Sequence, residues 1–247
     1  ELVVDQTTEQ VRLLMRVKQV LKERALMLYA QPIHNREGEG YHEILTRMRC
    51  GDSVIMPDQF IPLIVQFNLS QRFDMLVLET LFSVLHQHPG QRFSVNLLPA
   101  TLMQKDSAVQ IIALFQRYAV SPDLITIEVT EEQAFSNADI SQQNLEALRA
   151  FGCAIAIDDF GTGYANYERL KHLQADIIKI DGCFVRDILT DPLDAIMVKS
   201  IVEMARAKQM SVVAEYVESE PQKARLLELG VNYLQGYLVG NPQPLGE

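Results

Sequence analysis

Eight short apolar runs that alternate with helix-length segments constrain the fold of this chain more than any other feature. The runs have the length and the β-branched content of strands, and they cover residues 25–33, 40–49, 92–98, 124–130, 153–159, 175–181, 210–217 and 231–239. Segments such as 145–152 and 195–209 instead space their apolar residues along one helical face. This alternation is typical of parallel βα units, and eight units predict an α/β barrel of the (βα)8 TIM type.

The composition agrees with one barrel domain over residues 1–247. The chain is 48% hydrophobic and 22% charged, and we find no linker-like tract, so a single large core is expected. Its net charge of −10 argues against binding a nucleic-acid polymer. Three widely spaced cysteines favour a reducing compartment, so we expect a cytoplasmic domain. Because the chain opens with Glu1 instead of Met, we also expect it to be excised from a longer protein.

Each predicted strand carries a polar residue, in most cases near its C-terminal end. These residues are Gln31, Glu43, Asn96, Glu128, Asp158 with its neighbour Asp159, Lys179, Glu215 and Gln235. Alternation of side chains places Asn96, Glu128 and Asp158 on the face opposite the branched residues of the same strands. Because the C-terminal strand ends form the active site of such barrels, we expect the polar set to meet in one cavity.

Five carboxylates in one barrel mouth require compensating positive charge. Glu43, Glu128, Asp158, Asp159 and Glu215 would repel one another if all were ionised. Oxygen ligands of this kind select Mg²⁺ or Mn²⁺, with Ca²⁺ also possible, and adjacent aspartates suit two ions that clamp a phosphoryl displacement. In the competing interpretation, Asp158 and Asp159 only cap the turn that follows them.

Two basic residues of the predicted barrel mouth can each be interpreted in two ways. Lys179 is either a structural ion-pair partner or a group that orients and deprotonates water beside the metals. Arg47 follows Glu43 by four residues in a predicted strand, so both share a face and Arg47 either binds a phosphate or forms an ordinary ion pair.

A series of short motifs across nearly the whole chain resembles the EAL-domain cyclic di-GMP phosphodiesterase family. In chain order the motifs read YAQPI, EILTR, SVNL, IEVTEE, IDDFGTGY, IKID, VVAEYVE and LQGYLVGNP. The resemblance implies a barrel with an atypical, partly antiparallel start. It also implies metal-dependent hydrolysis of cyclic di-GMP to linear pGpG, frequent dimerisation, and sensory or cyclase domains before this one in a signalling protein that is anchored in the inner membrane in some cases.

The resemblance also implies a role for each matching residue. Those expected to hold the first metal are Glu43, Asn96, Glu128 and Asp158, and those expected to hold the second are Asp158, Asp159 and Glu215. Lys179 matches a lysine that contacts the nucleophilic water, and Gln235 a glutamine near that site. Gln31 and Arg47 match substrate-contacting positions. Glu131 matches a glutamate that holds the loop beginning at Asp159. Glu218 matches the second acid of the AEGVE motif, and we expect it to stabilise a loop as well.

Two departures from the family pattern keep the functional hypotheses open. Ile44 replaces an alanine and should be tolerated, but Tyr216 replaces a glycine and is expected to tilt Glu215 or to fill part of the pocket. We therefore weigh an active phosphodiesterase against a catalytically weak or inactive EAL module that binds cyclic di-GMP or a protein partner for regulation. An unrelated metal-assisted barrel enzyme is the third hypothesis.

Overall fold

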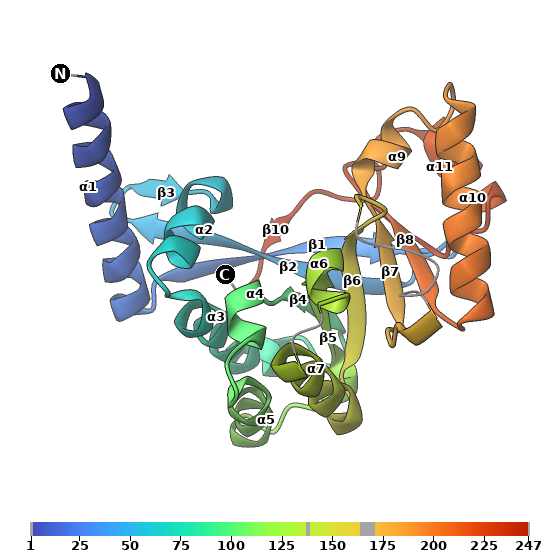
Figure 1. Ribbon diagram of the computed structural model, residues 1–247. Helices are drawn as coiled ribbons and strands as arrows, with labels where there is room; N and C mark the ends of the chain where they lie inside the picture. Colours follow the sequence, from blue (N-terminus) through green and yellow to red (C-terminus); the bar gives the residue numbers. More distant parts are fainter. Residues whose placement is uncertain (1, 137–138, 164–170, 247) are drawn as a thin grey trace.

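The computed structural model describes residues 2–136, 139–163 and 171–246 and contains the barrel that the sequence predicts. All eight predicted strands are present, as β1 (Leu26–His34), β2 (Gly40–Cys50), β4 (Phe93–Asn96), β5 (Ile125–Thr130), β6 (Ala154–Phe160), β7 (Ile177–Ile180), β8 (Ser211–Ala214) and β9 (Tyr233–Gln235). They are ordered β1-β9-β8-β7-β6-β5-β4-β2, and a β1–β2 pairing closes the barrel (Figure 1).

Strand β1 runs antiparallel to both of its barrel neighbours. It pairs with β2 over nine residue pairs from Leu26↔Met48 to His34↔Gly40, and with β9 at Ile33↔Gln235 and His34↔Leu234. The remaining barrel neighbours, from β2 through β9, pair in parallel. The expected partly antiparallel start of the barrel is therefore confirmed.

Two short strands and one long helix lie outside the predicted pattern. Strand β3 (Ser53–Ile55) extends the β2 edge, and β10 (Gln243–Pro244) pairs with β1. Helix α1 (Leu2–Glu23) stands at one side of the barrel, at the opposite side from α10 (Pro192–Ala207) in Figure 1. Buried Val17, Val20 and Leu21 attach the C-terminal half of α1 to the core.

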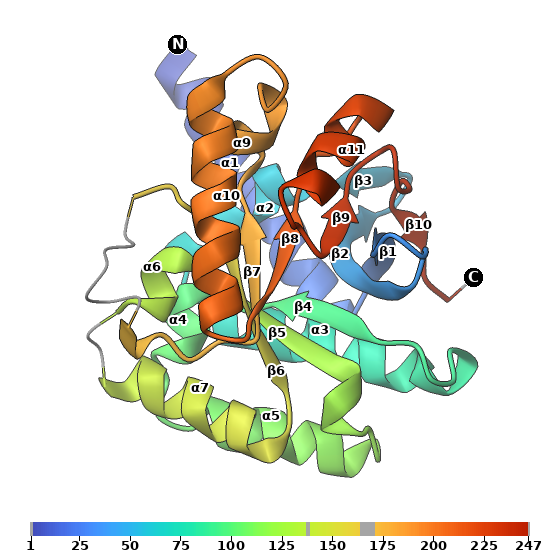
Figure 2. The ribbon, with the colours of Figure 1, turned by 90° about the vertical axis from the view of Figure 1, so that its right-hand side faces the viewer.

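Most of the other helices cover the outer surface of the barrel (Figure 2). They are α2 (Pro57–Gln66), α3 (Ser70–Val84), η1 (Leu85–Gln87), α4 (Pro99–Leu102), α5 (Ser107–Arg117), η2 (Pro122–Leu124), α6 (Glu131–Ala134), α7 (Asp139–Phe151), α9 (Gly182–Arg186) and α11 (Glu220–Glu228). The helical region between β3 and β4 is divided between α2 and α3, where Asn68 adopts a left-handed φ of 55°. Within the described residues, no helix is both long and apolar enough to cross a membrane.

The strand alternation separates the hydrophobic core from the polar interior of the barrel. Ile127, Ile157 and Ile178 are fully buried in the core cluster that the helices cover. Residues of the opposite face, Ser94 and Lys179, are equally inaccessible but lie inside the barrel. Helices therefore pack on the branched side chains, and the polar side chains are left to form the site.

Candidate active site

The ammonium group of Lys179 lies at the centre of four carboxylates inside the barrel. Its Nζ is 3.0 Å from Glu43 Oε2 and 2.9 Å from Glu128 Oε2, to both of which it donates hydrogen bonds. It is 3.2 Å from Glu215 Oε1 and 3.8 Å from Asp158 Oδ1. The side chain of Lys179 is fully buried, so these contacts are shielded from bulk water.

Burial and the four carboxylates act on the pKa of Lys179 in opposite directions. Burial lowers the pKa of an amine, but Glu128, Glu43, Glu215 and Asp158 together raise it well above its ordinary value. Lys179 therefore stays an ammonium group in this arrangement. Its four carboxylate contacts fit the structural ion-pair interpretation. Of the catalytic interpretation, orienting a water molecule fits this charge state and removing a proton from water does not.

The pKa values of the carboxylates are shifted in different directions. Burial, together with the nearby charge of Glu43, raises the pKa of Glu128 to about 8. Burial also acts to raise the pKa of Glu43, but Lys179 and hydrogen bonds from Gln235, Lys179 and Asn96 bring it below the ordinary value. At neutral pH, Glu43 is therefore ionised, whereas the protonated form of Glu128 is favoured.

A backbone irregularity explains how adjacent Asp158 and Asp159 both reach the site. Neighbouring residues of a regular strand point to opposite faces. The register between β6 and β7 shifts between Ile157 and Phe160, and Asp159 has a left-handed φ of 53°. Burial and the charge of Asp158 raise the pKa of Asp159 to about 6. Within the described ranges, Asp158, Asp159 and Glu215 form a group whose ligand oxygens lie within 4.8 Å of one another.

Three of the four expected ligands of the first metal contact Lys179, and the fourth, Asn96, contacts Glu43. Asn96 ends β4 and donates from Nδ2 to Glu43 Oε1 at 2.8 Å, which leaves its carbonyl oxygen available. Glu128 Oε1 is buried without a hydrogen-bond partner. The structure thus brings Glu43, Asn96, Glu128 and Asp158 together at one end of the barrel.

A cleft of about 490 Å³ opens from these carboxylates to solvent. It is lined by Gln31, Glu43, Leu45, Arg47, Asp158, Asp159, Glu215, Tyr216, Glu218, Gln235, Gly236, Tyr237 and Pro242. Gln235 donates to Gln31 Oε1 at 3.1 Å and to Glu43 Oε2 at 2.6 Å, which joins β9, β1 and β2. Arg47 lies over the Tyr29 ring at 5.1 Å from its centroid. Both predicted substrate-contacting residues, Gln31 and Arg47, thus face the same cleft as the acidic group.

Glu131 fixes the start of the loop that follows β6. Its Oε2 accepts hydrogen bonds from the backbone N–H groups of Gly161 at 2.9 Å and Thr162 at 3.2 Å. The side chain is almost fully buried, so a charged acceptor is held beside the chain that carries Asp159. Tyr164, the last residue of the IDDFGTGY motif, lies outside the described residues. Glu218, the other expected loop-stabilising acid, is exposed at the cleft.

Tyr237 is a cleft residue that the sequence interpretation missed. Its side chain is 70% exposed, and it lines both this cleft and a neighbouring hollow of about 560 Å³ with Tyr29 and Arg47. Its position two residues after Gln235, at the end of a predicted strand, is the signal that would have identified it.

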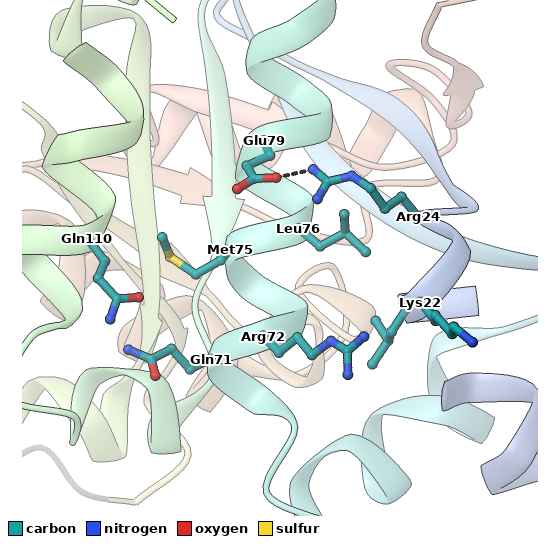
Figure 3. A pocket seen from close by; sticks show the side chains of 9 residues that line it. Lys22, Arg24, Gln71, Arg72, Met75, Leu76, Glu79 and Gln110 are labelled. Carbon is teal, nitrogen blue, oxygen red and sulfur yellow. Dashed lines mark hydrogen bonds and ion pairs between the residues drawn. The ribbon is translucent and has the colours of Figure 1, made fainter. Parts of the chain in front are cut away.

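A further hollow of about 400 Å³ lies between α1, α3 and α5, away from the carboxylates (Figure 3). Lys22, Arg24 and Arg72 line it, and Arg24 forms an ion pair with Glu79. None of the predicted site residues belongs to this hollow, so the candidate chemistry stays at the barrel mouth.

Comparison with known proteins identifies the family. The EAL domain model matches residues 15–242. A probable cyclic di-GMP phosphodiesterase, PdeA of Escherichia coli K12, is 60% identical over 100% of this chain and 34% of its own length. The cyclic di-GMP phosphodiesterase PdeF of the same organism is 43% identical over 96% of this chain and 32% of its own length. The chain therefore spans about a third of the length of these curated relatives.

Solved structures agree with the sequence relatives. A structure of PaMucR phosphodiesterase in complex with c-di-GMP superposes with a TM-score of 0.86 at 34% identity, covering 94% of this chain and 98% of that one. The FimX EAL domain of Xanthomonas citri in complex with c-diGMP shares the fold, with a TM-score of 0.89 at 20% identity over 98% of this chain and 97% of that one. The chain thus belongs to the EAL domain family.

Proposed function

We propose that this chain hydrolyses one phosphodiester bond of cyclic di-GMP to give linear pGpG, in a reaction that depends on Mg²⁺ or Mn²⁺. The observation that carries the proposal is the convergence of four carboxylates on the cleft that also holds Gln31 and Arg47. These carboxylates are Glu43, Asp158, Asp159 and Glu215, and the buried Lys179 and Glu128 lie directly behind them. The relatives at 60% and 43% identity are named as a probable and an assigned cyclic di-GMP phosphodiesterase, which supports the same substrate. Family membership removes the hypothesis of an unrelated barrel enzyme.

The residues at the mouth fit divalent cations. Metal binding requires deprotonated carboxylates. In that state Glu43, Glu128, Asp158, Asp159 and Glu215, together with the Lys179 ammonium, would carry a net charge of −4, which two divalent ions would neutralise. The buried and unpartnered Oε1 atoms of Glu128 and Gln235 add a second indication, because such atoms normally have partners. Every donor is a hard oxygen, as Mg²⁺ and Mn²⁺ prefer.

We assign the ligands as the resemblance implies. Glu43, Asn96, Glu128 and Asp158 would hold one ion, and Asp158, Asp159 and Glu215 the other. When bound, such ions polarise a phosphoryl oxygen and lower the pKa of a water molecule toward neutrality. Ca²⁺ is expected to bind without supporting turnover.

The protein's own groups position the reactants. Lys179 donates hydrogen bonds from a buried ammonium and can orient a water molecule among the carboxylates. Arg47 presents a guanidinium to a phosphate of the substrate, and Gln31 and Gln235 hold the adjacent cleft wall through their mutual hydrogen bond. Glu131 restrains the loop that follows Asp159 through two backbone N–H groups.

A catalytically weak or inactive module that binds cyclic di-GMP is the second candidate, and Tyr216 is the observation that favours it. Tyr216 lines the cleft directly after Glu215 and adopts a left-handed φ of 57°. A bulky residue in this conformation is strained, and the strain acts beside an expected metal ligand. Turnover and binding therefore need separate measurements.

We also propose that the chain forms a homodimer. Leu189, Leu193 and Ile196 expose more than half of their side chains on and before α10, at 52%, 68% and 58%. Large apolar side chains that are exposed close together in the sequence are candidates for a protein interface. Upstream sensory or cyclase domains, a cytoplasmic location and a membrane anchor in the full-length protein stay predictions.

The test is a cleavage assay with purified protein, cyclic di-GMP and Mg²⁺ or Mn²⁺. We expect pGpG to accumulate, EDTA to stop the reaction, and Glu43→Ala to lower the rate by more than about 100-fold, because even outer-shell partners of a metal are worth 10–100-fold. Glu203→Ala, which removes an exposed glutamate of α10, is the matched control and should retain the rate. A folded protein that binds the metal but leaves the substrate intact would contradict the hydrolase proposal and favour the binding module.

A further inference from the structure

Tyr216 combines strain with exposure at the edge of the cleft. Its side chain is 67% exposed, and it lines the cleft together with Asp158, Asp159 and Glu215. Its left-handed φ of 57° costs free energy in any residue that has a β-carbon and most in bulky ones. Strain of this kind persists only where the surrounding structure fixes the conformation, and it is concentrated at functional sites.

Gly182, the first residue of α9, supplies the support that fixes the tyrosine ring. A β-carbon at Gly182 would lie 2.4 Å from Cδ2, 2.8 Å from Cγ and 3.1 Å from Cβ of Tyr216. Real side chains essentially never approach so closely, so the ring rests directly on the glycine backbone. One side of Tyr216 is therefore held against α9, and the remaining surface of the ring is accessible from the cleft.

Besides groups for phosphates and metals, the cleft offers exposed aromatic surface at Tyr216 and at Tyr237. Asp158, Asp159, Glu215 and Glu218 are acidic, and Arg47 is basic. A tyrosine adds large and rigid contact area with few rotatable bonds. Aromatic side chains stack on nucleobases of any sequence because every base has a π-face.

We propose that Tyr216, supported by Gly182, is a stacking platform for one nucleobase of a cyclic dinucleotide bound in the cleft. The inference rests on the proposed function, since cyclic di-GMP supplies the base. It assigns Tyr216 a positioning role for the substrate and gives a physical reason for a strained tyrosine at this position. The competing expectation, in which the ring fills part of the pocket, predicts the opposite effect on affinity.

The first experiment compares Tyr216→Phe, Tyr216→Asn and Tyr216→Gly. Phenylalanine keeps the ring, whereas asparagine and glycine remove it and tolerate a left-handed φ. Affinity for cyclic di-GMP is measured by calorimetry with Ca²⁺ in place of Mg²⁺. We expect Tyr216→Phe to bind within about 2-fold of the unchanged protein, and the two ringless variants to bind about 5- to 100-fold more weakly. Ringless variants that bind as tightly as the unchanged protein, or more tightly, overturn the proposal.

The second experiment tests the support at Gly182. Gly182→Ala places a methyl group where the ring now lies, so it should weaken binding when Tyr216 is present. In the Tyr216→Asn background the same change should have no further effect, because the ring is already gone. Equal losses in both backgrounds would show that Gly182 acts independently of Tyr216, and that would contradict the proposed support.

Two further readouts separate stacking from general damage. The affinity for Mn²⁺ without substrate should be the same in Tyr216→Asn and in the unchanged protein. Equal affinities would show that the substitution leaves the carboxylates intact. A cyclic dinucleotide with 2-aminopurine in place of guanine should lose fluorescence on binding to the unchanged protein and to Tyr216→Phe, and lose less with Tyr216→Asn. Equal quenching by all three proteins refutes stacking. Absence of cleavage by the unchanged protein would contradict the proposed hydrolase activity alone, because the binding and quenching results still decide the role of Tyr216.

Discussion

Replacement of Lys179 by methionine removes the positive charge at the centre of the carboxylate cluster and nearly preserves the side-chain shape. The ammonium lies between 2.9 and 3.8 Å from four carboxylates, and its side chain is fully buried. Breaking a buried ion pair by removing one partner costs about 3–5 kcal/mol because the remaining charge is left uncompensated. We therefore expect the metal-free Lys179→Met protein to lose about 3–5 kcal/mol of unfolding free energy at pH 8.

Urea denaturation in EDTA, followed by circular dichroism, measures this loss. Lys199→Met, which removes an exposed lysine of α10, is the matched control and should stay within about 0.5 kcal/mol of the unchanged protein. Adding Glu128→Gln to Lys179→Met should restore part of the loss, because it removes one of the uncompensated carboxylates. If Lys179→Met unfolded at the same urea concentration as Lys199→Met, the inference that Lys179 compensates the buried charge would be wrong.

Three more predictions concern metal binding, the loop after β6 and pH. Mn²⁺ at about 100 times its Kd should raise the Tm of the chelated protein by about 5–10 °C, and Asp159→Asn should reduce the rise seen by calorimetry. Glu131→Gln should lower kcat/KM by about 10–100-fold because it weakens the hydrogen-bond acceptor for the N–H groups of Gly161 and Thr162. Glu132→Gln changes the exposed neighbouring glutamate and should leave the measured rate unchanged. Burial raises the pKa of Asp74 from 3.8 to about 7, so the folded protein takes up a proton that the unfolded chain does not hold. The resulting stabilisation is complete below pH 3.8 and is lost as the pH rises through 7, so between pH 5 and 8 the unchanged protein should lose about 2–3 kcal/mol more than Asp74→Asn in urea unfolding. Parallel pH profiles for the two proteins would contradict this assignment.

The sequence by itself determined the barrel and the identity of the residues at its mouth. Period-2 alternation places Ile127 and Ile157 on one face and Glu128 and Asp158 on the other, and this separation holds in any sheet that buries the apolar face. The ordered motifs added the antiparallel start, which hydrophobic periodicity alone does not reveal. Helix α1 was not among the predicted elements, and its buried residues Val17, Val20 and Leu21 lie in its C-terminal half.

Only the tertiary structure decided how the mouth residues relate to one another. Regular alternation would point Asp158 and Asp159 to opposite faces, and it is the register shift with a left-handed Asp159 that brings both to the site. The charge state of Lys179 follows from four carboxylates contributed by different strand ends, which no local pattern specifies. The packing of Tyr216 on Gly182 joins residues 34 positions apart, with a contact that depends on the absence of a single β-carbon. Local periodicity determines which face a side chain occupies, whereas distances, charge states and strain depend on contacts between segments that are remote in the chain.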